Sequence, residues 1–215
     1  MSSRKSARLR DKWRLKTWYS IHASDYFGGT EVGTIPAGEK STIVGRIIES
    51  TLYDITRQDI SQMNVKTYFQ ILSTEGNRAE AVFKGHEYSR EYLRSLVRRG
   101  SSRVDSSYNV DTKDQYKLRV HSVAFSRRRL NPSQETALRS IMGEILLEKA
   151  KNLNFNQLVQ ELVLGKLASE IHNKATKLAP LRHVGIRKSK LLELPDSKLE
   201  SKTIEPEVKA ETAQA

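Results

Sequence analysis

The side chains of this sequence best suited to chemistry are cations, and the chemistry they suit is phosphate binding. Among the first sixteen residues only Asp11 is acidic. Mutual repulsion and the cost of desolvation keep such a segment out of a core, so it needs a dense array of negative charge as its counterpart. A phosphate backbone is the commonest such array. The basic residues of this arm, residues 1–17, are Arg4, Lys5, Arg8, Arg10, Lys12, Arg14 and Lys16.

Aromatic side chains accompany the cations of the arm. Trp13 lies within it, and Trp18 and Tyr19 follow directly. An indole ring can stack on a base or contact a cation through its face, so we expect Trp13 to bind RNA, whereas Trp18 has anchoring of the arm to the core as its alternative role. A start rich in arginine and serine is also typical of organellar transit peptides, and a basic arm can lie on an anionic membrane.

Further basic clusters follow along the chain. Three adjacent arginines, 127–129, have no nearby acid before Glu135, and residues 174–190 contain no acid at all. Arg94, Arg98 and Arg99 have an alternative to RNA binding, because they could form an ordinary solvated face of a helix. Together the clusters predict an extended polyanion-binding surface. The expected RNA contacts beyond the arm are Arg94, Arg98, Arg99, Arg103, Lys117, Arg119, Arg127, Arg128, Arg129, Arg182, Arg187 and Lys188.

Composition agrees with a nucleic-acid partner. The chain has 215 residues, with 37 Lys and Arg against 25 Asp and Glu, and a net charge of +12. Such a balance favours polyanions. Without cysteine, the chain has no disulfides, thiolate nucleophiles or cysteine zinc sites. No apolar run approaches the roughly 20 residues of a membrane-spanning helix, and no secretory signal follows the basic start, so we expect a soluble, intracellular protein.

Catalytic patterns are absent from the sequence. It contains no glycine-rich phosphate loop, no Gly-x-Ser-x-Gly turn and no histidines at metal-ligand spacing. We therefore expect no enzyme, catalytic residue, metal site, cofactor or small-molecule substrate. A nucleic-acid enzyme would have to use carboxylates that only folding brings together, such as Asp54, Glu87 or Asp105.

Strand patterns dominate the region that must position the cations. Glycines and prolines from Gly28 to Gly38 indicate an irregular loop, and a strand is expected over 42–54. Alternating apolar residues predict one β-hairpin from 64–73 and 78–84, and another from 103–110 and 115–126. In the last of these strands, Lys117, Arg119 and His121 share the face opposite the apolar residues. That face is expected to be a row of cations.

Helical patterns occupy the gaps between these strands. Ser89 is expected to cap a short basic helix that runs up to Gly100, with an apolar stripe formed by Tyr92, Leu93, Leu96 and Val97. Asn131 and Pro132 begin a helix that reaches Lys151, and a second runs from Asn154 to Pro180, giving a helical hairpin that covers the sheet. A last strand is expected over 181–194. The acidic-leaning residues 195–215 are predicted to be a disordered tail.

Five segments also match a known family. Trp18–Tyr19, Phe83–Glu87, Tyr92–Arg99, Tyr116–Val120, and Pro180–Arg182 with Ile186–Lys188 resemble, in order, the archaeal and eukaryotic small-subunit ribosomal proteins of the S-three-a family, the archaeal form most closely. The resemblance covers roughly residues 12–195. It implies a β-barrel-like body, with an antiparallel or mixed sheet flanked by helices, which agrees with the α+β pattern of strands and helices along the chain. Length and composition favour one compact domain, residues 18–194, between arm and tail. The tail matches no family motif.

The resemblance also implies a function and partners. It implies a structural ribosomal protein of the cytoplasm that binds small-subunit rRNA on the platform, near the rRNA 3′ end and the mRNA exit. Neighbouring platform proteins are implied partners, and mRNA near the exit channel is a further one. The alternatives are a non-ribosomal RNA-binding regulator or a subunit assembly factor.

Overall fold

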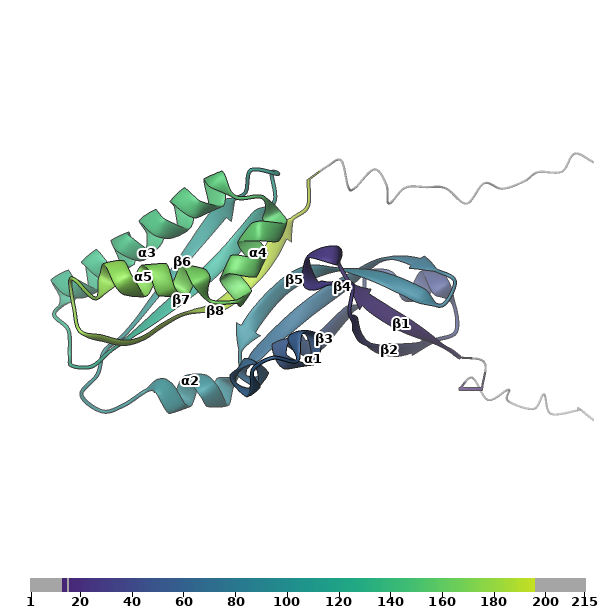
Figure 1. Cartoon of the computed structure of the whole chain (residues 1–215), viewed down its shortest axis with the longest axis horizontal. Coiled ribbons are helices and arrows are strands. Elements are labelled where there is room, and N and C mark those ends of the chain that lie inside the picture. Colours follow the sequence, from purple (N-terminus) through teal and green to yellow (C-terminus); the bar gives the residue numbers. More distant parts are fainter. Residues whose placement is uncertain (1–12, 15, 196–215) are drawn as a thin grey trace, which may run out of the picture.

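The computed structural model describes residues 13, 14 and 16–195, which contain one mixed sheet of eight strands (Figure 1). The strands are β1 (Thr17–Ala23), β2 (Glu31–Ala37), β3 (Ile47–Thr51), β4 (Val65–Glu75), β5 (Arg78–Tyr88), β6 (Arg103–Asp111), β7 (Lys117–Ser126) and β8 (Leu181–Glu193). The α-helices are α1 (Leu52–Thr56), α2 (Arg90–Leu96), α3 (Pro132–Asn152), α4 (Phe155–Val163) and α5 (Lys166–Ala175). Short 3-10 helices span Asp25–Phe27, Lys40–Thr42 and Ile60–Asn64.

The sheet is open and has two halves joined by β5 and β8. Its strand order is β2-β1-β5-β8-β7-β6, while β4 pairs with the other edge of β5 and carries β3. Strands β1 and β5 are parallel, and the other pairs are antiparallel. The two halves lie end to end along the long axis of the molecule (Figure 1). The predicted α+β fold with a mixed sheet is confirmed.

Both predicted hairpins are present; the first extends further than its sequence pattern, to Glu75 and Tyr88, whereas in the second β7 begins at Lys117 and not at residue 115. In β4 the side chains of Thr67, Phe69 and Ile71 are buried, while the residues between them are only half-buried. This alternation places one face of the hairpin on the core, because successive side chains of a strand point to opposite faces. The second hairpin pairs β6 with β7 over its whole length, from Arg103 opposite Phe125 to Asp111 opposite Lys117.

The helices α3, α4 and α5 cover one face of the C-terminal half. Leu138, Met142, Ile145 and Leu146 form the buried stripe of α3. The helix begins as predicted at Asn131, whose amide donates to Gln134 Oε1 at 3.2 Å. The prediction of a single second helix up to Pro180 is wrong, because Gly165 adopts a left-handed conformation with φ of 82° and separates α4 from α5. Glycine accepts this backbone without the steric cost that other residues have.

The N-terminal region differs most from the sequence prediction. The expected irregular loop from Gly28 to Gly38 contains β2, whose pairing with β1 brings Ile35 opposite Tyr19. Gly33 and Pro36 are tolerated because β2 is an edge strand and needs partners on one side only. The strand expected over 42–54 is only Ile47–Thr51; a 3-10 helix precedes it, and Thr51 and Asp54 form a capping box that begins α1.

A short buried joint connects the two halves. Gly85 pairs with Lys190, His86 with Ser189 and Glu87 with Lys188. The Ser189 hydroxyl accepts from the His86 amide at 3.2 Å and donates to His86 Nδ1 at 2.7 Å, while His86 Nε2 donates to the Ile186 carbonyl at 3.2 Å. A side chain at residue 85 would lie 2.3 Å from the Ser189 carbonyl oxygen, so glycine permits the strands to approach. The joint holds β8 in line with the N-terminal half.

Candidate nucleic-acid interface

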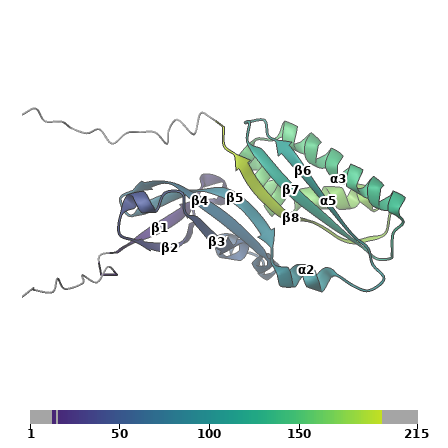
Figure 2. The ribbon, with the colours of Figure 1, turned by 180° about the vertical axis from the view of Figure 1, so that it is seen from behind.

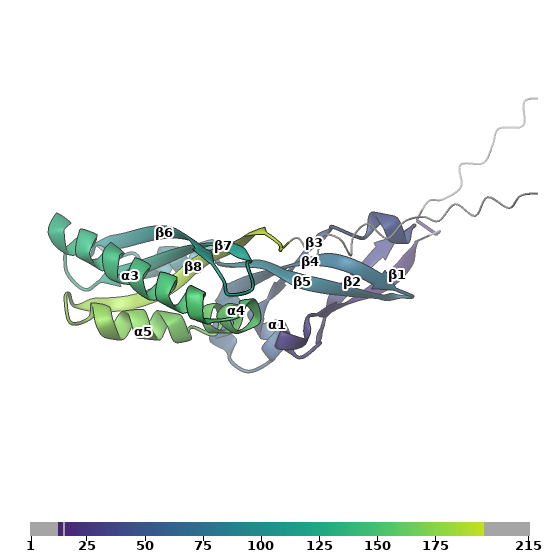
Figure 3. The ribbon, with the colours of Figure 1, turned by 90° about the horizontal axis from the view of Figure 1, so that it is seen from above.

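The C-terminal half of the sheet has one face covered by helices and an opposite, open face that is accessible along β6 and from Lys117 to His121 of β7, whereas Val123 and Phe125, farther along β7, are fully buried. Seen from above, α3, α4 and α5 all lie on the same side of β6, β7 and β8 (Figure 3). Seen from behind, the strands lie in front of α5 (Figure 2). The hydroxyls of Ser106 and Ser122 lie 3.3 and 3.4 Å from the Met142 sulfur of α3, which identifies the residues that point inward. Their neighbours along each strand point to the open face.

Cations follow one another across this open face. In the first row, Asn109, Arg119 and Lys190 are in register across β6, β7 and β8. In the second row, Ser107, His121 and Lys188 are in register. Residues directly opposite one another share a face of the sheet, so the two rows form one surface. We call these six residues, together with Arg187, the cationic sheet face.

The same rows continue into the N-terminal half with a different charge. Lys190 lies opposite Gly85, which pairs with Tyr68, and Lys188 lies opposite Glu87, which pairs with Lys66. Lys66 in turn forms an ion pair with Glu49 at 2.6 Å. Burial, followed by the nearby Glu49 and Glu87, raises the pKa of Tyr68. Acids and cations therefore balance around Tyr68, and the cation surplus lies on the C-terminal half.

Ion pairs neutralise only part of the open face. Lys188 Nζ lies 2.9 Å from a Glu87 oxygen, and Lys117 Nζ lies 2.6 Å from a Glu193 oxygen. Arg119 donates from Nε to the neutral Asn109 amide oxygen at 2.9 Å. Within residues 16–195, Lys190 and Arg187 form no ion pair. Exposed pairs of this kind contribute little to stability, so phosphates can replace the carboxylates at small cost.

Two bulges in β8 redirect arginines that the sequence singled out. Phe125 pairs with His183 and Ser126 with Leu181, so Arg182 is an additional residue without a partner in β7. By the same pattern, Arg187 is additional between Ile186 and Lys188. Such bulges bend a strand and change the direction of a side chain. Arg187 lines a depression on the cationic sheet face, whereas Arg182 lines a groove beside α5 together with His172 and His183.

The far end of the C-terminal half brings together two basic clusters that are distant in sequence. Ser126 donates its amide to the Ser102 carbonyl at 3.0 Å, and Leu130 donates its amide to the Ser102 hydroxyl at 3.0 Å. These bonds fix the connection 127–130 against the segment that precedes β6. The exposed arginines of this distal cluster are Arg98, Arg99, Arg103, Arg127, Arg128 and Arg129.

The helix α2 carries fewer of these cations than the sequence predicts. It is capped by Ser89 as expected but ends at Leu96, so Arg98 and Arg99 lie beyond it, and Arg94 is its exposed cation in the last turn. The expected apolar stripe is only half-buried, and Val97 is 53% exposed. Tyr92 packs α2 against the sheet, because its ring lies 5.4 Å from the ring of Tyr88 and 6.0 Å from that of His183.

The structure describes only the end of the predicted arm. Trp13, Arg14 and Lys16 are exposed, and Lys16 Nζ lies 4.4 Å from the centre of the Trp13 ring. Trp18 is 59% exposed although it lies in β1, so it does not anchor the arm in the core. The predicted contacts Arg4, Lys5, Arg8, Arg10 and Lys12 lie outside the described residues, as does the tail beyond Pro195.

The sequence analysis left out four residues of the cationic sheet face. Ser107, Asn109, His121 and Lys190 were not among the expected RNA contacts. The signal for His121 was present, because it alternates with the same period as Lys117 and Arg119. Burial, then the charges of Arg187, Lys188 and Arg119, lower the pKa of His121, and Asp105 opposes them.

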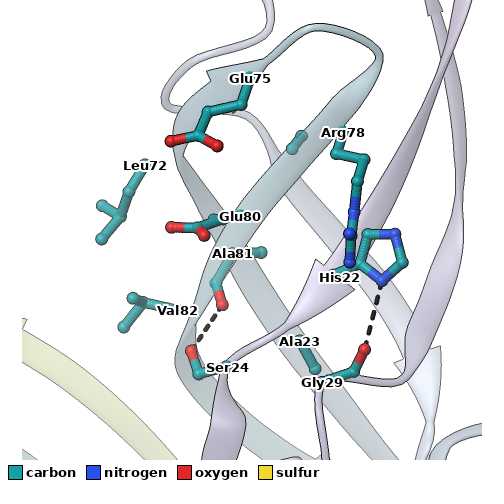
Figure 4. Close-up of a pocket in the computed structure, with 11 residues that line it drawn as sticks. His22, Ala23, Ser24, Gly29, Leu72, Glu75, Arg78, Glu80, Ala81 and Val82 are labelled. Atoms are coloured by element: carbon teal, nitrogen blue, oxygen red, sulfur yellow. Dashed lines mark hydrogen bonds between the residues drawn. The ribbon is translucent and has the colours of Figure 1, made fainter.

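Another cavity, of about 300 Å³, lies at the seam between β1 and β5 (Figure 4). Ser24 donates to the Ala81 carbonyl at 2.7 Å, and His22 Nδ1 lies 3.2 Å from the Gly29 carbonyl oxygen. Glu75, Glu80 and Arg78 give the cavity mixed charge, in contrast to the cationic sheet face. Within residues 13–195, no three His, Asp or Glu side chains are arranged to hold a metal ion. None of the described helices is long and apolar enough to cross a membrane.

Comparison with known proteins gives one consistent result. The model of the Ribosomal S3Ae family matches residues 4–195. A small ribosomal subunit protein eS1 from Desulfurococcus amylolyticus is 47% identical over 195 residues, 91% of both chains. Proteins of the same name from Staphylothermus marinus and Saccharolobus islandicus are 44% and 45% identical over 91% of this chain and 92% and 93% of their own lengths. The chain therefore belongs to the Ribosomal S3Ae family, as an archaeal member.

Proposed function

We propose that the chain binds small-subunit rRNA through the cationic sheet face, the distal cluster and the arm, and so stabilises the platform of the small ribosomal subunit. As a member of its family the chain is a ribosomal protein with a structural role, not an enzyme. The small ribosomal subunit is cytoplasmic. The observation that carries the proposal is the open sheet face, because helices cover the opposite face and leave the cations free to meet a partner.

The chemistry of the open face suits an RNA backbone. Arginine and lysine side chains spaced along adjacent strands can each meet a phosphate, and arginine can bridge two phosphate oxygens. Ser107 and Asn109 add neutral polar groups between the cations. In this proposal, residues 1–17 act as an anchoring arm, residues 18–194 as one folded domain and residues 195–215 as a tail.

The finer placement is part of the same proposal. We place the protein near the rRNA 3′ end and the mRNA exit, with neighbouring platform proteins as partners and mRNA as a further contact. The 3-10 helix before β4 supports a protein partner, because its apolar residues Ile60 and Met63 are largely exposed. No membrane or small-molecule partner belongs to the proposal.

A binding experiment with matched charge variants tests the interface. The double variant Arg119→Gln/Lys190→Gln should bind a small-subunit rRNA transcript at least about tenfold more weakly than the wild type, because two phosphate contacts are lost. The control Lys151→Gln/Lys166→Gln removes the same charge from exposed positions of α3 and α5. Equal losses in the two variants would show a general charge effect and contradict the interface.

A second experiment separates a resident protein from its alternatives. Small subunits are washed with increasing salt, and the amount of the chain per rRNA is measured. A structural component should remain at one copy per subunit after the wash. Loss of the chain under conditions that retain other ribosomal proteins would indicate an assembly factor or a free RNA-binding regulator instead.

A further inference from the structure

A small polar depression of about 140 Å³ interrupts the cationic sheet face where β6, β7 and β8 lie side by side. It is lined by Asp105, Ser106, Ser107, His121, Ser122 and Arg187. The hydroxyls of Ser106 and Ser122 lie 2.6 Å apart and face Met142 in the core, so they are already used. Asp105 forms an ion pair with Arg103 at 2.7 Å.

Three polar side chains of the depression remain available to a ligand. Within the described part of the chain, the side chains of Ser107, His121 and Arg187 make no hydrogen bond. Ser107 lies directly opposite His121, and the bulge in β8 adds Arg187 beside them. A hydroxyl, an imidazole and a guanidinium are all donors suited to anionic oxygens.

We propose that Ser107, His121 and Arg187 form a seat for one RNA phosphate, and that His121 takes up a proton from solvent when this phosphate binds. The inference rests on the proposed function, because it assumes that RNA reaches the cationic sheet face. Arg187 bridges two phosphate oxygens and the Ser107 hydroxyl donates to one of them. The imidazole donates a hydrogen bond and, once protonated, adds a positive charge.

The charges around His121 explain why proton uptake accompanies binding. In the free protein, burial and the cations Arg187, Lys188 and Arg119 lower the pKa of His121, and Asp105 opposes them only weakly because Arg103 engages it. The imidazole is therefore neutral at pH 7. A bound phosphate offsets the repulsion of these cations and raises the pKa. Between the free and the bound pKa, affinity falls as pH rises, by at most about tenfold per pH unit for one proton.

The first test measures affinity of the full chain for a small-subunit rRNA transcript between pH 5.5 and 7.5 at constant salt. The wild type should lose at least about threefold more affinity over this range than His121→Gln, which has no titrating ring. The control His172→Gln changes a histidine of α5 on the helix side and should keep the wild-type dependence.

The second test follows the ring of His121 by NMR with inorganic phosphate as the probe. Phosphate should raise the pKa of His121, whereas chloride at the same ionic strength should not. Arg187→Gln should raise the pKa of His121 in the free protein, because one repelling charge is lost, and should abolish the response to phosphate. This variant keeps the test decisive if His121→Gln fails to fold.

The outcomes separate the seat from the interface. Tight rRNA binding whose pH dependence is unchanged in His121→Gln, together with no response of His121 to phosphate, would overturn the seat and leave the proposed function intact. Failure of the wild-type chain to bind the transcript would overturn the proposed function. In that case a response of His121 to inorganic phosphate would still support an anion seat.

Discussion

Acid should destabilise this protein through His86, which lies in the joint between β5 and β8. The side chain is 1% exposed, and burial lowers its pKa from 6.5 to about 4. The unfolded state therefore binds a proton more readily than the folded state. The stability that the neutral His86 ring contributes is fully present above pH 6.5 and is lost as the pH drops toward 4. The difference between the unfolded-state and folded-state pKa of His86 corresponds to about 3 kcal/mol of unfolding free energy, of which about 2 kcal/mol is lost by pH 5.

Urea unfolding at pH 7.5, 6 and 5 measures this loss. His86→Gln lowers stability at pH 7.5, because the bonds to Ser189 and Ile186 change, but it removes the titrating ring. The free energy of unfolding of the wild type should therefore fall about 2 kcal/mol more between pH 7.5 and 5 than that of the variant. The control His172→Gln should follow the wild type. Identical pH dependence in wild type and His86→Gln would refute the assignment of a buried, neutral imidazole.

Three further changes have expected outcomes. Gly85→Ala places a methyl group 2.3 Å from the Ser189 carbonyl and should cost about 2 kcal/mol or more in urea unfolding, whereas Gly33→Ala, with open space around it, should change stability little. Leu138→Ala should cost about 2–5 kcal/mol, because Leu138 is fully buried, whereas Leu147→Ala on the exposed side of α3 should cost about 0.5 kcal/mol or less; similar losses would contradict the packing described for α3. Arg119→Gln/Lys190→Gln should reduce the slope of log affinity for rRNA against log salt by about 1.5 to 2, measured by filter binding, and an unchanged slope would argue against phosphate contacts at these residues.

Sequence periodicity predicted the parts of the fold whose pattern is local. The two hairpins, α3 and β8 follow from alternating or helical spacing of apolar residues and from capping at Asn131. The edge strand β2 escaped prediction, because Gly33 and Pro36 are typical of loops and only pairing with β1 makes them a strand. The break at Gly165 also escaped, since the apolar spacing continues across it.

The sequence predicted that the interface is cationic, but it predicted only part of how the cations are arranged on the folded sheet. Alternation along β7 placed Lys117, Arg119 and His121 on one face from the sequence alone. The bulges that add Arg182 and Arg187 to β8 depend on register with β7, which no local pattern encodes. For the same reason the contact between 98–103 and 127–130 appears only in the folded chain, through Ser102 and Ser126.

Directed hydroxyl-radical probing tests the central claim most directly. The chain lacks cysteine, so a single Ser107→Cys on the cationic sheet face and a single Ser140→Cys on the exposed side of α3 can each carry an iron chelate. In assembled small subunits, the chelate at residue 107 should cleave rRNA strongly and close to its 3′ end, and the chelate at residue 140 should cleave rRNA much less. Stronger cleavage from residue 140 than from residue 107 would contradict an rRNA interface on the open face of the sheet.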